Sequence, residues 1–233
     1  MPEPKADLVE IFSSYQGEGI FVGVKQIFIR FAGCNLDCSF CDTSKTAIIK
    51  NASVEDILKN VREMRKRFGP PHSVSLTGGE PLLYTEFLGR LLPELKKAGF
   101  NIYLETNGTL TKELKRIIAH VDIIAMDIKL PSSTGIPPLW EKHMEFLHAA
   151  RKKNIFIKAV VTENTSRSDI IKARDIVEKV DRDIPFVLQP ASTALRGDFA
   201  VSKEKIFDHY RISGEKLADV RIIPQVHKLM GIR

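Results

Sequence analysis

The sequence of 233 residues contains only three cysteines and no long apolar run. Three thiols cannot all pair within one chain, and all three lie between Cys34 and Cys41. This usage predicts a reducing compartment, the cytoplasm, in place of a disulfide framework. No stretch of about eighteen apolar residues is present, so we expect no membrane contact. The N-terminal segment lacks a basic head followed by an apolar run, so we expect no secretory signal.

Charge of one sign does not gather in any one segment. The formal net charge is +6, but Lys and Arg are spread along segments with helical periodicity, without interleaved aromatic residues. We therefore predict no nucleic-acid partner. Hydrophobic residues make up 43% and charged residues 27%, as in a globular chain that buries its core without disulfides. We predict one domain spanning residues 1–233.

Short β-rich segments alternate with helical patterns along the chain. The strand candidates are continuous apolar runs, as expected for parallel strands covered on both faces: residues 26–31, 73–77, 101–105, 121–127, 155–161, 185–189 and 220–224. Helical periodicity occupies residues 53–68, 85–98, 111–119, 137–153, 168–180 and 202–211. Ser53 and Asp56 have the spacing of a capping box.

Repeated βα units predict an α/β fold. The first choice is a partial, incomplete TIM-type barrel of about six βα units. An open doubly wound sheet is the alternative. In either fold, sites form at the carboxyl ends of strands. Polar motifs follow the strand candidates at these ends: GCNLDC, TGGEP, ETNG, DIK and QPAS.

The cysteine motif Cys34-x3-Cys38-x2-Cys41 carries the strongest chemical signal. Three thiolates on one loop can ligate three irons of a cubane cluster, which leaves the fourth iron open to an outside ligand. A zinc site is the structural alternative, but zinc favours four ligands and the nearest histidine in sequence is His72. A redox-active C-x2-C pair would leave Cys34 unexplained.

With an aromatic residue before its last cysteine, this motif resembles that of the radical S-adenosylmethionine superfamily. The resemblance implies a 4Fe-4S cluster on the three cysteines, S-adenosyl-L-methionine chelated to the fourth iron, and cleavage to a 5′-deoxyadenosyl radical. Adjacent glycines in TGGEP allow close approach to the backbone, and the Glu80 carboxylate suits an ammonium group. The implied cofactor contacts are Phe40, Asp42, Gly79, Glu80, Asp127, Lys129 and Gln189. Asn107 has a turn as its plainer interpretation.

The segment from Glu10 to Thr43 includes QGEG and, with TGGEP, ETNG, QP and the C-terminal QVHKLMGI, resembles the 7-carboxy-7-deazaguanine synthase family. That family converts 6-carboxy-5,6,7,8-tetrahydropterin into 7-carboxy-7-deazaguanine with loss of ammonia, in queuosine and archaeosine precursor biosynthesis. The resemblance implies Mg²⁺ bound through Thr43, a homodimer, and an electron donor such as flavodoxin or ferredoxin. It places the small pterin substrate against Tyr15, Gln16, Gly17, Glu18, Arg30, Thr77 and Arg233.

The residue types suit a pterin carboxylate. Gln16 and Glu18 can read the donor and acceptor edge of the ring, and Arg30 can bind the carboxylate with two nitrogens. The plainer interpretations are a connecting loop for QGEG and a paired strand-end arginine for Arg30. Two departures stand out: Asp127 lies where the family often has serine, and Arg233 ends the chain where many relatives end in proline. His227 and Lys228 match the family tail.

Two other classes of function stay open on the sequence alone. An activase that takes a hydrogen atom from a glycine of a partner protein also uses C-x3-C-x2-C, although often with additional cluster cysteines. A non-enzymatic zinc or nucleic-acid module is the other class, and metal analysis separates it from a cluster protein.

Overall fold

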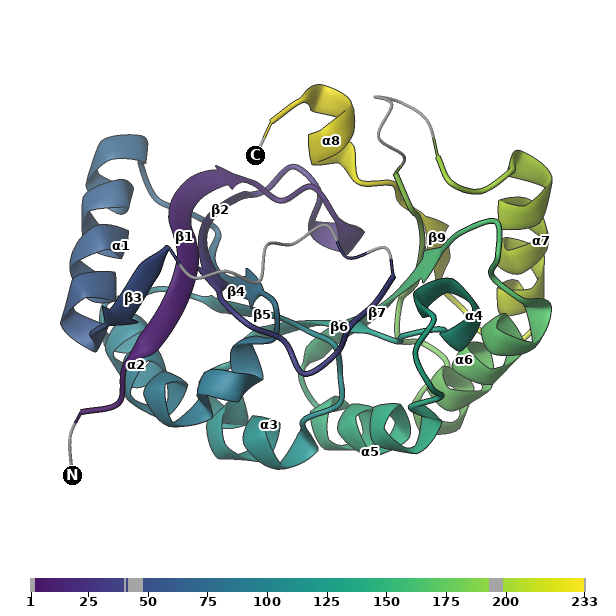
Figure 1. Cartoon of the computed structure of the whole chain (residues 1–233), viewed down its shortest axis with the longest axis horizontal. Helices are drawn as coiled ribbons and strands as arrows, with labels where there is room; N and C mark the ends of the chain where they lie inside the picture. The colour runs from purple at the N-terminus through teal and green to yellow at the C-terminus, as the bar shows by residue number, and fades with distance from the viewer. Residues whose placement is uncertain (1–2, 40, 42–47, 193–198, 233) are drawn as a thin grey trace.

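The computed structural model describes residues 3–39, 41, 48–192 and 199–232, which form one curved sheet covered by helices (Figure 1). The sheet has the strand order β3-β1-β2-β4-β5-β6-β7-β8-β9. Its strands are β1 (Ala6–Tyr15), β2 (Lys25–Phe31), β3 (Ile49–Ala52), β4 (Ser73–Gly78), β5 (Ile102–Thr106), β6 (Ile123–Asp127), β7 (Asn154–Val161), β8 (Phe186–Pro190) and β9 (Val220–Ile222).

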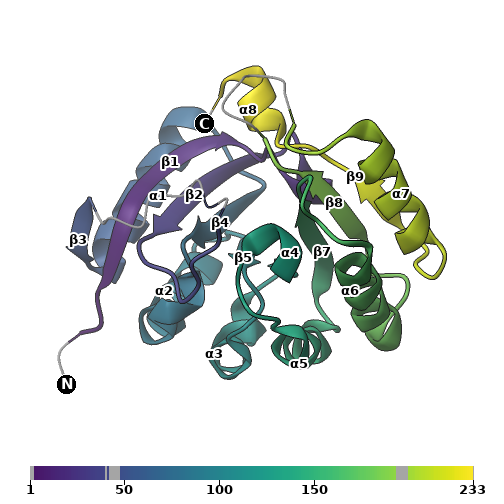
Figure 2. The ribbon, with the colours of Figure 1, turned by 45° about the vertical axis from the view of Figure 1, so that its right-hand side comes forward.

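Neighbouring strands from β2 through β4 to β9 pair in parallel, whereas β1 pairs antiparallel with both β2 and β3. Figure 2 shows the resulting open arch, whose two edges are β3 and β9. The predicted partial barrel is therefore confirmed, and each of the seven predicted strands lies in its parallel part. β1 and β3 are absent from the predicted set.

Six helices cover the outer face of the arch (Figure 1). They are α1 (Val54–Phe68), α2 (Thr85–Lys97), α3 (Thr111–Ile117), α5 (Trp140–Ala150), α6 (Arg167–Val180) and α7 (Lys203–Gly214). α1 begins at the predicted capping box, in which Ser53 and Asp56 bond each other's backbone N–H. Shorter helices are α4 (Pro131–Thr134) and α8 (Val226–Met230), with 3₁₀ turns η1 (Gly19–Phe21), η2 (Pro81–Tyr84) and η3 (Ile118–His120). Among the described residues, no helix has the length and apolar character needed to cross a membrane.

Apolar side chains fill both faces of the sheet. The large core lies between the sheet and the outer helices, while a smaller cluster lies on the inner face, made of Tyr103, Ile123, Ala125, Phe156 and Val187. Phe21 of η1 packs on this inner cluster, with its ring 5.7 Å from that of Tyr103 in an edge-on arrangement. The turn between β1 and β2 therefore closes the amino end of the barrel interior.

Candidate active site

Polar side chains form the next layer inside the barrel. Successive side chains of a strand point to opposite faces, so the residue two positions after the last member of the inner cluster on each strand shares its face. Those positions hold Glu105, Asp127, Lys158 and Gln189, and all four line a cavity of about 580 Å³. The apolar floor and the polar wall above it come from the same four strands.

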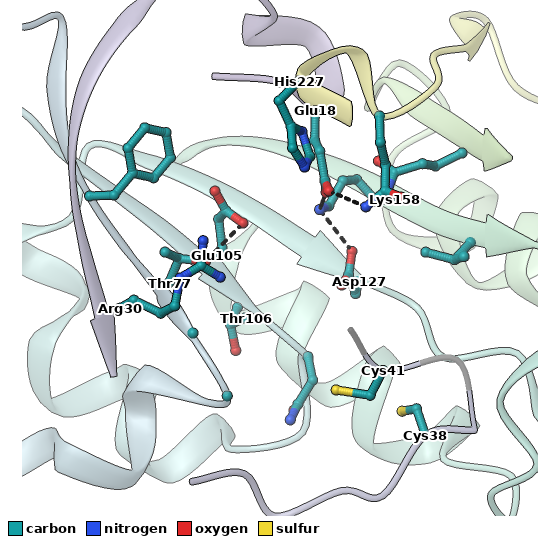
Figure 3. A pocket seen from close by; sticks show the side chains of 18 of the residues that line it. Glu18, Arg30, Cys38, Cys41, Thr77, Glu105, Thr106, Asp127, Lys158 and His227 are labelled. Carbon is teal, nitrogen blue, oxygen red and sulfur yellow. Dashed lines mark hydrogen bonds and ion pairs between the residues drawn. The ribbon is translucent and has the colours of Figure 1, made fainter. Parts of the chain in front are cut away.

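The cavity gathers most of the predicted site residues (Figure 3). Besides the polar wall, its lining includes the three cysteines together with Tyr15, Gln16, Gly17, Glu18, Arg30, Thr77, Gly79 and Lys129. The structure thus brings these residues together, while their contacts with ligands stay predictions. Phe40, Asp42, Thr43 and Arg233 lie outside the described residues.

The cysteine loop is held against the glycine pair of TGGEP. The Gly79 N–H donates to Phe31 O at 3.1 Å, and the Glu80 N–H donates to Gly33 O at 2.9 Å. A Cβ on Gly79 would overlap the carbonyl oxygen of Gly33. Glycine at position 79 is therefore needed for the cysteine loop to approach, in addition to any ligand.

The thiols fit an iron–sulfur cluster. None of the three forms a disulfide in the described structure, and Cys34 and Cys38 are partly buried while Cys41 is exposed. The Cys34 sulfur accepts the Leu36 N–H at 3.4 Å and faces the Asn107 amide nitrogen at 3.8 Å, and such donors stabilise a thiolate. Burial raises the pKa of the Cys38 thiol, and the charge of Lys129 opposes this effect. In the described parts of the chain, no group of three or more His, Cys, Asp and Glu is arranged to hold a single metal ion.

Glu80 is held by hydrogen bonds beside the glycine pair. Its carboxylate is fully buried and accepts hydrogen bonds from Leu82 N (3.1 Å), Thr106 Oγ1 (2.9 Å) and Asn107 N (2.8 Å). Burial raises its pKa to about 7. The carboxylate braces the TGGEP loop against the loop after β5 and is not among the residues that line the cavity. Its expected contact with the cofactor ammonium stays a prediction. A backbone contact of Glu80 with the cofactor stays a prediction.

Side chains of the predicted pterin site form hydrogen bonds to one another and to their neighbours. Gln16 Nε2 donates to Glu105 Oε1 at 2.9 Å and to Gln26 Oε1 at 3.0 Å. Thr77 Oγ1 donates to Glu105 Oε2 at 3.1 Å. Arg30 pairs with Glu10 at 3.1 Å, so it is a paired strand-end arginine as the plainer interpretation predicts, and it lines the cavity as well.

The C-terminal segment packs over the QGEG loop. The Val226 N–H donates to Gly17 O at 2.9 Å, and Gln225 Nε2 donates to Glu18 Oε1 at 2.8 Å. A Cβ on Gly17 would overlap the His227 ring. Glycine in this loop therefore lets α8 pack at the mouth of the cavity, where His227 and Lys228 join its lining (Figure 3).

Three ion pairs between largely buried side chains line the cavity. Lys158 Nζ is 2.6 Å from Glu18 Oε2 and 3.5 Å from Asp127 Oδ1, and Lys129 Nζ is 2.8 Å from Asp127 Oδ2. Burial alone would raise the pKa of Glu18, but the charge of Lys158 and the bonds from Gln225 and Lys158 hold that pKa well below its usual range. The pKa of Asp127 is likewise lowered against burial by Lys129 and Lys158. Both carboxylates are therefore ionised acceptors.

Comparisons with known proteins agree with this site. The model of the radical SAM superfamily matches residues 28–162. The 7-carboxy-7-deazaguanine synthase of Geobacter sulfurreducens is 41% identical over 99% of both chains, and that of Methanothermobacter thermautotrophicus is 34% identical over 98% of both. The chain belongs to the 7-carboxy-7-deazaguanine synthase family of radical S-adenosylmethionine enzymes. The crystal structure of QueE from Escherichia coli has the same fold, with a TM-score of 0.61 at 22% identity over 96% of this chain and 95% of that one.

Members of this family use S-adenosyl-L-methionine, and the cavity wall offers atoms that fit it. Gln189 Oε1 and Asp127 Oδ1 are buried and accept no hydrogen bond from the described residues. Each is a buried acceptor whose need a ligand hydroxyl or ammonium would satisfy. The buried acceptors of Asp127 and Gln189 fit a cofactor with hydroxyl or ammonium donors, while the predicted roles of these residues, of Lys129 and of the three cysteines stay predictions.

Three functional side chains are missing from the predicted set: Glu105, Lys158 and Gln225. Glu105 belongs to the ETNG motif, but its bonds to Gln16 and Thr77 depend on how the strands align. Lys158 stands alone within the apolar run IFIKAVV. A charged residue inside such a run is the signal that would have identified it, because a buried lysine needs an acidic partner.

Proposed function

We propose that this chain converts 6-carboxy-5,6,7,8-tetrahydropterin into 7-carboxy-7-deazaguanine with loss of ammonia. The observation that carries the proposal is one cavity that joins three cysteine thiols to a layer of ionised carboxylates and amides. When bound, the cluster and S-adenosyl-L-methionine supply the 5′-deoxyadenosyl radical that starts the ring contraction. A reductant such as flavodoxin or ferredoxin supplies the electron.

The chain's own residues bind and orient the pterin. Glu18 stays ionised beside Lys158, so it can accept from the N–H groups of the pterin edge. Gln16 both donates and accepts, and its bond to Glu105 fixes which way its amide faces. In Figure 3, Arg30 lies on the side of the cavity opposite Glu18 and Lys158, and it can exchange Glu10 for the substrate carboxylate.

Other parts of the chain limit the access of water to the reacting atoms. The apolar cluster under Phe21 closes the cavity from below, and α8 covers the QGEG loop from above. Exclusion of water strengthens each charge–dipole contact within the site. It also protects a reactive radical from side reactions, which this chemistry requires.

Magnesium, subunit assembly and location complete the proposal. We include Mg²⁺ at Thr43, supported by the family resemblance, because a hydroxyl with waters and substrate oxygens suits that ion. A homodimer in the cytoplasm is the proposed state. Omission of Mg²⁺ from the assay tests the magnesium requirement, and light scattering of the purified protein tests the homodimer.

The deciding experiment is an anaerobic assay of the reconstituted protein with reductant, S-adenosyl-L-methionine, Mg²⁺ and the carboxytetrahydropterin. Release of the deazaguanine acid is expected. Formation of 5′-deoxyadenosine alone would show that the substrate is wrong while the radical chemistry is right. Arg30→Ala should raise the KM for the pterin at least tenfold and leave the iron content unchanged, whereas Arg221→Ala, an exposed arginine paired with Asp219, serves as the control. Unchanged KM in Arg30→Ala would remove that residue from the site.

A further inference from the structure

Within the described part of the chain, Lys158 is the one side chain that forms ion pairs with both Glu18 and Asp127, the two carboxylates of the charge centre in the cavity. It lies on β7, its side chain is 5% exposed, and its ammonium lies between Glu18 and Asp127 (Figure 3). Glu18 belongs to the QGEG loop on the substrate side. Asp127 ends β6 on the side of the cysteines.

The ammonium is shared unequally by the two carboxylates. It donates to Glu18 Oε2 at 2.6 Å, whereas Asp127 Oδ1 lies 3.5 Å away, too poorly placed to accept a hydrogen bond. The other oxygen of each carboxylate has its own donor, Gln225 for Glu18 and Lys129 for Asp127. Asp127 Oδ1 is therefore an open acceptor that still attracts Lys158 by charge.

Other charges near this centre do not replace Lys158. Glu105 adds a third carboxylate that acts on Lys158, and His227 acts on Glu18 from the C-terminal segment. Together they leave Lys158 as the cation against which Glu18 is held. Removal of one partner from a buried pair leaves an uncompensated charge, so the position of Glu18 depends on this lysine.

We propose that Lys158 is a positioning residue that couples the two halves of the cavity, so that the pterin and S-adenosyl-L-methionine each bind more tightly when the other is present. The inference rests on the proposed function. A cofactor hydroxyl that donates to Asp127 Oδ1 reduces the pull of Asp127 on the shared ammonium. Lys158 is then committed to Glu18, whose carboxylate is fixed to accept from the pterin. Linkage makes the effect equal in both directions.

Calorimetry on the anaerobically reconstituted full chain without reductant tests this coupling, because both ligands bind but no turnover occurs. The Kd of each ligand is measured alone and with the other at saturation. In the unaltered protein we expect tightening of at least about fivefold, the low end of allosteric couplings. Lys158→Met should raise the Kd of the pterin at least tenfold and reduce the coupling below twofold. Lys158→Arg, which keeps the charge, should retain part of it.

Asp127→Asn separates coupling from simple damage. It removes the pull of Asp127 on Lys158 and keeps the bond between Lys158 and Glu18, so the pterin Kd measured alone should tighten toward the value that the unaltered protein shows with the cofactor present, while the coupling is lost. Lys96→Met is the matched control, because it removes another ion-paired lysine, 2.7 Å from Asp122 before the start of β6 at the opposite end of the sheet. That variant should keep the full coupling.

The outcomes are distinct. Retention of fivefold coupling in Lys158→Met or in Asp127→Asn overturns the inference. If Lys158→Met does not fold by circular dichroism, Asp127→Asn and Lys158→Arg decide alone. A wild-type chain that neither binds nor converts the pterin refutes the proposed function, whereas a chain that converts it without coupling refutes the inference only.

Discussion

Alanine at Gly79 is expected to disturb the cysteine loop more than the rest of the fold. A Cβ built on Gly79 lies 1.7 Å from Gly33 O and 3.1 Å from Cys34 N, and contacts below 3.0 Å are essentially never seen. The two backbones must therefore separate by at least 1.3 Å, since neither is a side-chain tip that can turn away. The separation strains the hydrogen bond from Glu80 N to Gly33 O, which is 2.9 Å long.

The cost has two parts, an overpacking penalty of about 1–3 kcal/mol and a weakened hydrogen bond of about 1 kcal/mol. We expect Gly79→Ala to lower the free energy of unfolding by about 3 kcal/mol. The iron content after reconstitution should fall to less than half, because Cys34 shifts relative to the other two cysteines. Urea unfolding of the metal-free protein and iron analysis of the reconstituted protein measure the two effects separately.

Gly89→Ala is the matched control. Gly89 lies within α2, and a Cβ there meets nothing within 4 Å. This substitution should stabilise the protein by about 0.5–1 kcal/mol, because alanine loses less conformational freedom in a helix. If Gly79→Ala is as stable as wild type and binds full iron, the argument from close approach is wrong. Full iron in a destabilised Gly79→Ala would confine the role of the contact to folding.

Two further predictions concern pH and substrate affinity. Burial lowers the pKa of His143 from 6.5 to about 4. As pH falls, the unfolded chain therefore takes up a proton before the native state does. The contribution of His143 to the free energy of unfolding is complete above pH 6.5 and is lost, by about 3 kcal/mol, as pH drops towards 4. His143→Gln should flatten that part of the urea-unfolding profile, and an unchanged slope would contradict the assignment. Glu10→Gln removes the partner of Arg30, an exchange worth up to about 1 kcal/mol for a partly exposed pair. The pterin Kd should therefore drop up to about fivefold by calorimetry, and a weaker Kd would show that Glu10 helps to bind the substrate.

The parallel part of the sheet is predictable because its strands are buried on both faces and read as continuous apolar runs. β1 lacks this signal. Its residues from Glu10 to Ser14 are only partly buried, Tyr15 is exposed, and Ser13 and Ser14 interrupt its apolar pattern. As an antiparallel strand between β2 and the short β3, it has less of its surface covered than the central strands. The local sequence pattern therefore does not predict β1, because this strand depends on its pairing with β2 and β3.

The same distinction between local sequence pattern and long-range contact applies to the site. Cysteine spacing and the glycine pair are local, so the sequence predicts the cluster loop and the loop that supports it. The direction in which Glu80 points is not local, because Thr106 and Asn107 from the next strand end capture its carboxylate. The partner of Lys158 is also distant in sequence, since Glu18 lies 140 residues earlier in the chain.

Lys158 also connects the function to the register of the sheet. Its strand pairs Lys158 with Asp127 of β6 and with Val187 of β8. A slip of one residue would turn every side chain of β7 to the other face, which would move Lys158 from three carboxylates into the apolar core under the outer helices. An ammonium there would be buried without a partner, at a cost far above that of an apolar mismatch. The charge that couples the two ligand sites therefore also disfavours the misaligned strand, so binding and folding select the same register.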